Sequence, residues 1–276
     1  MRPSSCPPLA PFLPSVKLAK RGNDFLGKII RVGGTQWKIT EALCDVKYQR
    51  AEEPFEGRQT FACTLLRDKK NKLPGVKDVV VKVKYQVRPG GANKHFIANT
   101  LSERTEALTG RLSAREFESA LSSLEWWTER HRINKYTRDE IIALDRFAKA
   151  DCEYIPNLLA WVQRQDMHPG DKEYMPGGYV VLIFMTKLPA KQLDEDFFKM
   201  TDVEREEIRQ AFKVAYMEIC KLGVRVGDSG MRNLMWDDKS KKCYIVDFED
   251  WYELKPERVA TAWGDYLFRS WDIADS

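Results

Sequence analysis

Two neighbouring motifs carry most of the information about the fold of this chain: Val-Gly-Asp-Ser-Gly-Met-Arg-Asn (226–233) and Cys-Tyr-Ile-Val-Asp-Phe-Glu-Asp (243–250). Asp228 stands five residues before Asn233, and Asp247 stands fourteen residues after Asn233. A polar run, Trp-Asp-Asp-Lys-Ser-Lys-Lys, separates two short strand-like segments between them. This pattern predicts a β-hairpin, which places the ends of both strands side by side. Two carboxylates and one amide would then meet at one end of the hairpin.

These three residue types suit one kind of chemistry. A carboxylate can orient an attacking hydroxyl, and an amide and a second carboxylate can hold Mg²⁺ on phosphate groups, which is the set that phosphoryl transfer requires. The alternative interpretation is a pair of solvated aspartates that cap a hairpin.

The two motifs resemble the catalytic centre of the protein-kinase-like superfamily, which also includes aminoglycoside and choline phosphotransferases. Asp228 and Asn233 match the D-x-x-x-x-N pair, and Asp247-Phe248-Glu249 stands where D-F-G stands. The wording G-D-x-x-x-R-N-L followed by D-F-E is similar to that of small fungal kinase-like proteins, as is C-x-x-x-P-x-L-L at 152–159. The resemblance covers roughly residues 75–250.

The resemblance implies an α+β, two-lobed protein-kinase-like fold. Residues 1–22, rich in proline and ending in basic residues, are expected to form a disordered arm. Residues 23–187 would form a small lobe built on an antiparallel sheet, with an insertion at about 88–135 that contains a helix over 113–129. Residues 188–276 would form a short, mainly helical large lobe with the catalytic and metal-binding loops.

The segment Asp-Val-Val-Val-Lys-Val-Lys-Tyr (78–85) is the clearest strand. Period-two alternation places Val80, Lys82 and Lys84 on one face. The segment resembles the V-A-I-K strand of kinases, whose lysine binds the α- and β-phosphates. On that match Val80 would face adenine and Lys82 the phosphates, with Lys84 as the competitor for this role. The alternative is an ordinary strand with one solvated, lysine-bearing face.

A helix is predicted to start at Thr137, because apolar residues recur there at helical spacing. Glu140 takes the place of the helix glutamate that pairs with the strand lysine in the superfamily, and Asp145, about one turn later, is the alternative. Thr137 and Glu140 also read as a T-x-x-E capping box. Pro156 is expected to stop this helix and to precede a short strand.

The apolar run 179–185 predicts a buried strand. The resemblance implies that the chain segment from Met185 to Leu188 is the hinge whose backbone groups bind adenine. A second helix is predicted over 204–222, with a capping box that starts at Thr201 and a glycine directly after its end.

The chain departs from the kinase pattern at several points. It contains no G-x-G-x-x-G and no A-P-E, and Val226 replaces the histidine that usually stands two residues before the catalytic aspartate. Only 26 residues follow Asp250, too few for a peptide-binding platform of the protein-kinase type. Arg232 could neutralise phosphate charge or pair with Asp237 or Asp238. These departures favour a pseudokinase-type binding module without turnover.

The polar residues that remain favour an enzyme. The resemblance predicts an ATP- and Mg²⁺-dependent phosphotransferase that transfers the γ-phosphate to a hydroxyl of an unidentified small-molecule or protein acceptor. Asp228 would be the catalytic residue, and Asn233 and Asp247 would bind the metal. The nucleotide would be bound by residues of both lobes: Lys82, Glu140, Val80, Met185 and Leu188.

Composition excludes several other classes of protein. The chain has 276 residues, 43% hydrophobic and 31% charged, with a net charge of +4 that is too small to indicate nucleic acid. Its six cysteines are scattered, and its three histidines show no metal-ligand spacing, so the sequence predicts a reducing environment and no zinc site. No apolar run is long enough to span a bilayer. We expect a cytoplasmic or nuclear protein with no membrane or nucleic-acid partner.

Overall fold

The computed structural model describes residues 24–88, 133–175 and 177–275. The predicted N-terminal arm lies outside these residues. Most of the predicted insertion, with its expected helix over 113–129, lies outside them as well.

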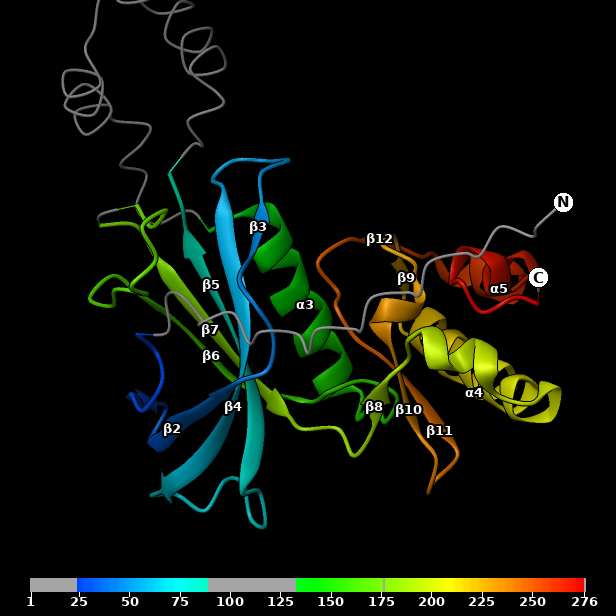
Figure 1. Cartoon of the computed structure of the whole chain (residues 1–276), viewed down its shortest axis with the longest axis horizontal. Helices are drawn as coiled ribbons and strands as arrows, with labels where there is room; N and C mark the ends of the chain where they lie inside the picture. Colours follow the sequence, from blue (N-terminus) through cyan, green and yellow to red (C-terminus); the bar gives the residue numbers. More distant parts are fainter. Residues whose placement is uncertain (1–23, 89–132, 176, 276) are drawn as a thin grey trace, which may run out of the picture.

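A large antiparallel sheet forms the first part of the molecule (Figure 1). Its two edges approach one another, because the Arg164 guanidinium donates a hydrogen bond of 3.0 Å to the carbonyl of Arg31. The sheet therefore curls around the side chains on its inner face. In spatial order its strands are β1 (Ile29–Val32), β2 (Thr35–Ala42), β4 (Glu56–Asp68), β5 (Asp78–Gln86), β7 (Val180–Thr186) and β6 (Leu158–Arg164), and β3 (Lys47–Gln49) also pairs with β4.

The alternation predicted for β5 is confirmed. Val79, Val81 and Val83 are fully buried in the apolar cluster on the inner face of the curled sheet. Val80 points the other way and packs against a second apolar cluster. One face of the strand thus packs in the apolar core, and the opposite face carries the lysines, as period-two alternation requires.

Helix α3 (Lys135–Lys149) begins two residues earlier than the sequence predicted, and the predicted capping box does not form. The N-cap is Asn134, whose side chain accepts a hydrogen bond from the backbone N–H of Tyr136. The Thr137 hydroxyl instead donates a hydrogen bond of 2.5 Å to Glu56. A tertiary partner on β4 has therefore replaced the local cap.

The end of α3 also differs from the prediction. The helix ends at Lys149, and Asp151 takes a left-handed backbone conformation with φ of 49°. Pro156 lies beyond this point and does not stop the helix, but the short strand expected after it is present as β6.

The second part follows β7 and contains the predicted hairpin. In this hairpin Leu234 pairs with Ile245, and the long helix begins with the predicted capping box between Thr201 and Glu204. The elements of this part are β8 (Lys191–Gln192), a 3₁₀ turn (Glu195–Lys199), α4 (Asp202–Lys221), β9 (Val224–Val226), a 3₁₀ turn (Met231–Asn233), β10 (Leu234–Asp237), β11 (Lys242–Ile245), β12 (Trp251–Glu253), a 3₁₀ turn (Pro256–Thr261) and α5 (Tyr266–Ser270).

The predicted fold class is confirmed: the chain is α+β, with an antiparallel sheet and α3 in one part and a shorter part in which α4 is the largest element (Figure 1). The second apolar cluster joins the two parts, because it includes Phe147 of α3, Phe212 of α4 and Phe248 of the segment after β11. Among the described residues, no helix combines the length and apolar character needed to cross a bilayer.

Candidate active site

Two loops lie side by side at the end of the hairpin, as the sequence predicted. We call residues 227–233 the aspartate loop and residues 246–250 the acidic loop. The backbone N–H of Val246 donates to the carbonyl of Asn233 at 2.9 Å, and the N–H of Gly227 donates at 2.9 Å to the far end of the acidic loop. Backbone hydrogen bonds thus join the two loops at both ends.

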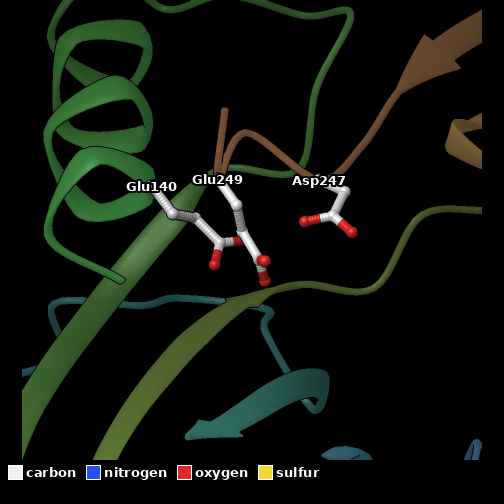
Figure 2. A group of neighbouring side chains, drawn as sticks. All are labelled: Glu140, Asp247 and Glu249. Atoms are coloured by element: carbon white, nitrogen blue, oxygen red, sulfur yellow. The ribbon is translucent and has the colours of Figure 1, made fainter. Parts of the chain in front are cut away.

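Six charged side chains from distant parts of the sequence meet beside the acidic loop. The Lys82 ammonium lies 2.5 Å from Glu140 Oε1 and 3.0 Å from Asp247 Oδ1. Figure 2 shows that Glu140 approaches from α3 and that Glu249 and Asp247 approach from the acidic loop. The structure therefore brings together the lysine, the helix glutamate and the second aspartate of the sequence prediction. The charge cluster consists of Arg58, Lys82, Lys84, Glu140, Asp247 and Glu249.

The two lysines of β5 occupy different depths in the charge cluster. The Lys84 ammonium lies 2.8 Å from Glu140 Oε2 and 2.8 Å from Glu249 Oε1, and its side chain is 1% exposed. Lys82 is 12% exposed and contacts Asp247. Lys82 is therefore the outer of the two lysines and the more accessible from solvent.

Arg58 and Glu249 were missed as members of this cluster by the sequence reasoning. Arg58 forms an ion pair with Glu249, and its Nη1 lies 3.8 Å from Asp247 Oδ2. Arg58 pairs with Lys84 in the register of β4 and β5. Only this register, which the sequence does not state, could have pointed to Arg58. In the sequence, Glu249 stands at the position of the glycine of D-F-G.

The charges of the cluster stabilise one another against burial. Burial alone would lower the pKa of Lys82, but the carboxylates around it, Asp247 foremost, raise this pKa above its usual value. Burial would raise the pKa of Glu249, but Lys84 and the other two cations hold it well below its usual range. The cluster contains three basic and three acidic side chains, so its formal charges balance.

Glu140, and not the alternative Asp145, is the acidic residue that α3 brings to the site. Glu140 is 1% exposed, whereas Asp145 faces solvent and pairs with Lys149 at 2.5 Å. Glu56 holds the first turn of this helix to the sheet, because it accepts hydrogen bonds of 2.5 Å from Thr137 and 2.6 Å from the Tyr179 hydroxyl. The position of Glu140 thus depends on a second buried carboxylate.

Among the described residues, the side chains of Asp228 and Asn233 have their partners within the aspartate loop itself. Arg232 forms an ion pair with Asp228, and not with Asp237 or Asp238, which was one of the two alternatives that the sequence left open for it. The Asn233 amide nitrogen donates a hydrogen bond of 2.9 Å to the backbone carbonyl of Asp228. The Asp228 side chain is 44% exposed. The loop therefore presents a carboxylate to solvent.

Asp247 carries an unusual backbone conformation. Its φ is +69°, in the left-handed region that few residues other than glycine, asparagine and aspartate adopt readily. Residues with such strained backbone conformations cluster at functional sites, where neighbouring contacts maintain them. The ion pair with Lys82 and the backbone bonds of the acidic loop provide those contacts here.

The residues predicted for the adenine site lie on the strand pair beside the cluster. Val80 is half-buried and directly opposite Met185 in the register of β5 and β7. Leu188 is half-buried just after β7 ends. The structure brings Val80 and Met185 together on the strands that also carry Lys82.

Oxygen ligands for a metal ion are present at the acidic loop. Glu140, Asp247 and Glu249 offer carboxylate oxygens that lie within 4.8 Å of one another. Asp247 is the one residue that this group shares with the predicted pair Asn233 and Asp247. Carboxylate and amide oxygens suit Mg²⁺. Asp247 is the most exposed of the three carboxylates, with 23% of its side chain accessible.

Comparison of the sequence with protein-family models and with curated proteins gives no match. Among solved structures, the chain is similar to the kinase PK-1 of Cydia pomonella granulovirus, with 13% sequence identity and a TM-score of 0.40. The similarity covers 79% of this chain and 52% of that one. The chain thus spans about half the length of the granulovirus kinase.

Proposed function

We propose that this chain is an ATP- and Mg²⁺-dependent phosphotransferase, which transfers the γ-phosphate of ATP to a hydroxyl group of an acceptor. The observation that carries the proposal is the position of the Lys82 ammonium between two carboxylates, 2.5 Å from Glu140 and 3.0 Å from Asp247. A buried glutamate holds a lysine beside a loop carboxylate. Phosphoryl transfer uses such a lysine on the phosphates and such a carboxylate on the metal.

The nucleotide would lie along the outer face of β5 and β7. Adenine would contact Val80 and Met185 and bind backbone groups near Leu188, and the phosphates would reach Lys82. Val80 is apolar and lies two residues before Lys82 on the same face, so one strand serves both ends of the ligand. The strand spacing of about 3.3 Å per residue gives these two side chains a separation of roughly 7 Å.

Asp247 and Asn233 would hold Mg²⁺. The Asn233 nitrogen is already engaged within the aspartate loop, so its amide oxygen is the atom that would bind the metal. The metal neutralises negative charge on the phosphates when it is bound. The hydrogen bond between Val246 and Asn233 keeps the two metal ligands on adjacent backbone segments.

Asp228 would accept the proton of the attacking hydroxyl. Its carboxylate is partly exposed, as contact with a separate acceptor molecule requires, and it lies on the loop that carries Asn233. Arg232 holds the carboxylate before the acceptor arrives. The reaction would then depend on positioning and on charge compensation by residues that the fold already holds in place.

The first test measures binding. Mg²⁺ and ATP together should raise the melting temperature of the protein, because a ligand that binds only the folded state stabilises it by mass action. Asp247→Asn should lose this increase. Asp145→Asn, which changes an exposed carboxylate on α3, should keep it. Absence of any increase in the unaltered protein would remove the proposal.

The second test measures turnover with a panel of hydroxyl-bearing acceptors. Asp228→Asn should keep the stabilisation by Mg²⁺ and ATP but lower the rate of ATP consumption by about 10²- to 10⁴-fold, the range for loss of a positioned base. Stabilisation without turnover, unchanged in Asp228→Asn, would instead indicate a pseudokinase-type binding module.

A further inference from the structure

The chain segment next to the charge cluster contains no glycine that would let its backbone approach a phosphate closely. Residues 43–55 connect β2 to β4 and contain no glycine. Part of the segment is β3, whose residues Lys47–Gln49 pair with β4. A backbone that receives an anion needs consecutive free N–H groups and close approach, which glycine permits. This composition favours cationic side chains over backbone N–H groups as the partners of a polyphosphate at Lys82.

Arg58 lies where such a side chain is needed. It stands near the start of β4, directly after this connection, and is opposite Lys84 in the strand register, while Thr60 is opposite Lys82. Residues that are opposite one another on neighbouring strands share a face of the sheet. Arg58 thus lies on the same face as both lysines, and its side chain is the most exposed of the three cations, at 28%.

The contacts of Arg58 leave it able to take a further partner. One ion pair with Glu249 orients the guanidinium, and its Nη1 lies 3.8 Å from Asp247 Oδ2. Lys82 contacts the other oxygen of the same carboxylate. Arg58 and Lys82 therefore flank Asp247 on its two sides. A guanidinium has five donors, so it can keep Glu249 while it also binds an oxygen of a second anion.

We propose that Arg58 binds the phosphates of the nucleotide and that Glu249 positions it for this task. The proposal rests on the proposed function, since it deepens the same site. The long contact between Arg58 and Asp247 would be exchanged for a hydrogen bond from the guanidinium to a phosphate oxygen. Arg58 then provides from a side chain the positive charge that the glycine-free connection does not provide from its backbone.

The test compares ligands that differ only in their phosphates. Binding of adenosine, AMP, ADP and ATP, each with Mg²⁺, is measured by titration calorimetry for the unaltered protein, Arg58→Gln and Arg67→Gln. Arg67 is an exposed arginine farther along β4 and is the matched control. Arg58→Gln should weaken ADP and ATP binding by about ten- to a hundredfold, the range for a lost charge-assisted hydrogen bond. Adenosine binding should not change.

A merely structural role for Arg58 gives a different result. Arg58→Gln would then weaken adenosine and ATP binding in parallel, or would leave both unchanged, and either result overturns the inference. If Arg58→Gln does not fold, the double variant Arg58→Gln/Glu249→Gln is tested in its place. Its affinities for ATP and for adenosine are then compared in the same way. This double variant removes both partners, and so leaves no unpaired charge in the cluster.

The outcome also separates this inference from the proposed function. If the unaltered protein binds none of the four ligands, the proposed function fails and the inference fails with it. If the unaltered protein binds ATP with Mg²⁺ and Arg58→Gln binds it equally well, the inference about Arg58 alone is wrong.

Discussion

The charge cluster and the aspartate loop place their acidic residues in contrasting settings. Asp247 forms an ion pair with Lys82, which lies 165 positions away in the sequence. The acidic loop that carries Asp247 is also joined at both ends to the aspartate loop by backbone hydrogen bonds. Asp228 is held by Arg232 and Asn233, which stand four and five residues after it in the same loop. The first carboxylate depends on the whole fold, and the second depends on one turn of chain.

Under the proposed function, this difference would separate two tasks within one site. Groups that bind phosphate and metal must be fixed before the ligand arrives, because they act by charge and position. The group that meets the acceptor must remain accessible, which its half-exposed side chain allows. We therefore expect changes in the cluster to affect stability and nucleotide binding, and changes at Asp228 to affect turnover alone.

The largest effect on stability is expected for Glu140→Gln. This change leaves Lys82 and Lys84 with fewer carboxylates in a site where Glu140 and Lys84 are almost fully buried. Removing one partner of a buried ion pair costs about 3–5 kcal/mol, because the other charge remains buried. Urea unfolding of the variant should show this loss. Asp145→Asn on the same helix should unfold as the unaltered protein does, and an equal loss in both variants would contradict the comparison.

A smaller effect is expected from acid, through Glu249. Its pKa is held well below the usual value, chiefly by Lys84 among its charged neighbours, so its ion pairs stabilise the fold above the unfolded-state pKa of about 4.3. This stabilisation is lost as the pH falls below about 5 toward the pKa of the folded state. Glu249→Gln should therefore be less stable than the unaltered protein at pH 7, by about 2 kcal/mol.

The difference in unfolding free energy between Glu249→Gln and the unaltered protein should shrink when denaturant unfolding is repeated at pH 5, 4 and 3. A difference that stays constant over this range would show that the Glu249 carboxylate does not stabilise the fold by its charge.

The smallest effect is expected for Arg232→Gln. Both side chains of the ion pair between Arg232 and Asp228 are about half exposed, and exposed pairs of this kind contribute about 0–1 kcal/mol. The melting temperature and the affinity for ATP should hardly change. A loss of stability as large as that of Glu140→Gln would mean that the aspartate loop is not the independent local unit that its contacts describe.

Much of this arrangement could be predicted from patterns that are local in the sequence. The hairpin that joins the two loops, the alternation of β5 and the capping box of α4 each depend on residues a few positions apart, and each is present. The pairing of Lys82 with Glu140 came from a family resemblance and not from spacing, because 58 residues separate them.

Features that depend on distant strands could not be predicted in this way. Arg58 meets Glu249 across 191 residues, and this contact requires the register between β4 and β5. The start of α3 was misplaced for a similar reason: Glu56, on β4, takes the hydroxyl of Thr137 that a capping box would have used. At the start of α3, a tertiary hydrogen bond therefore replaced the local capping interaction that the sequence predicted.

The positive φ of Asp247 determines how this residue can be replaced in an experiment. Asparagine adopts the left-handed region at least as readily as aspartate, whereas alanine or a β-branched residue would be strained there. Asparagine therefore removes the carboxylate charge while it preserves the turn of the chain. Alanine or valine at this position would disturb the turn as well, and the resulting loss of activity could not be assigned to chemistry alone.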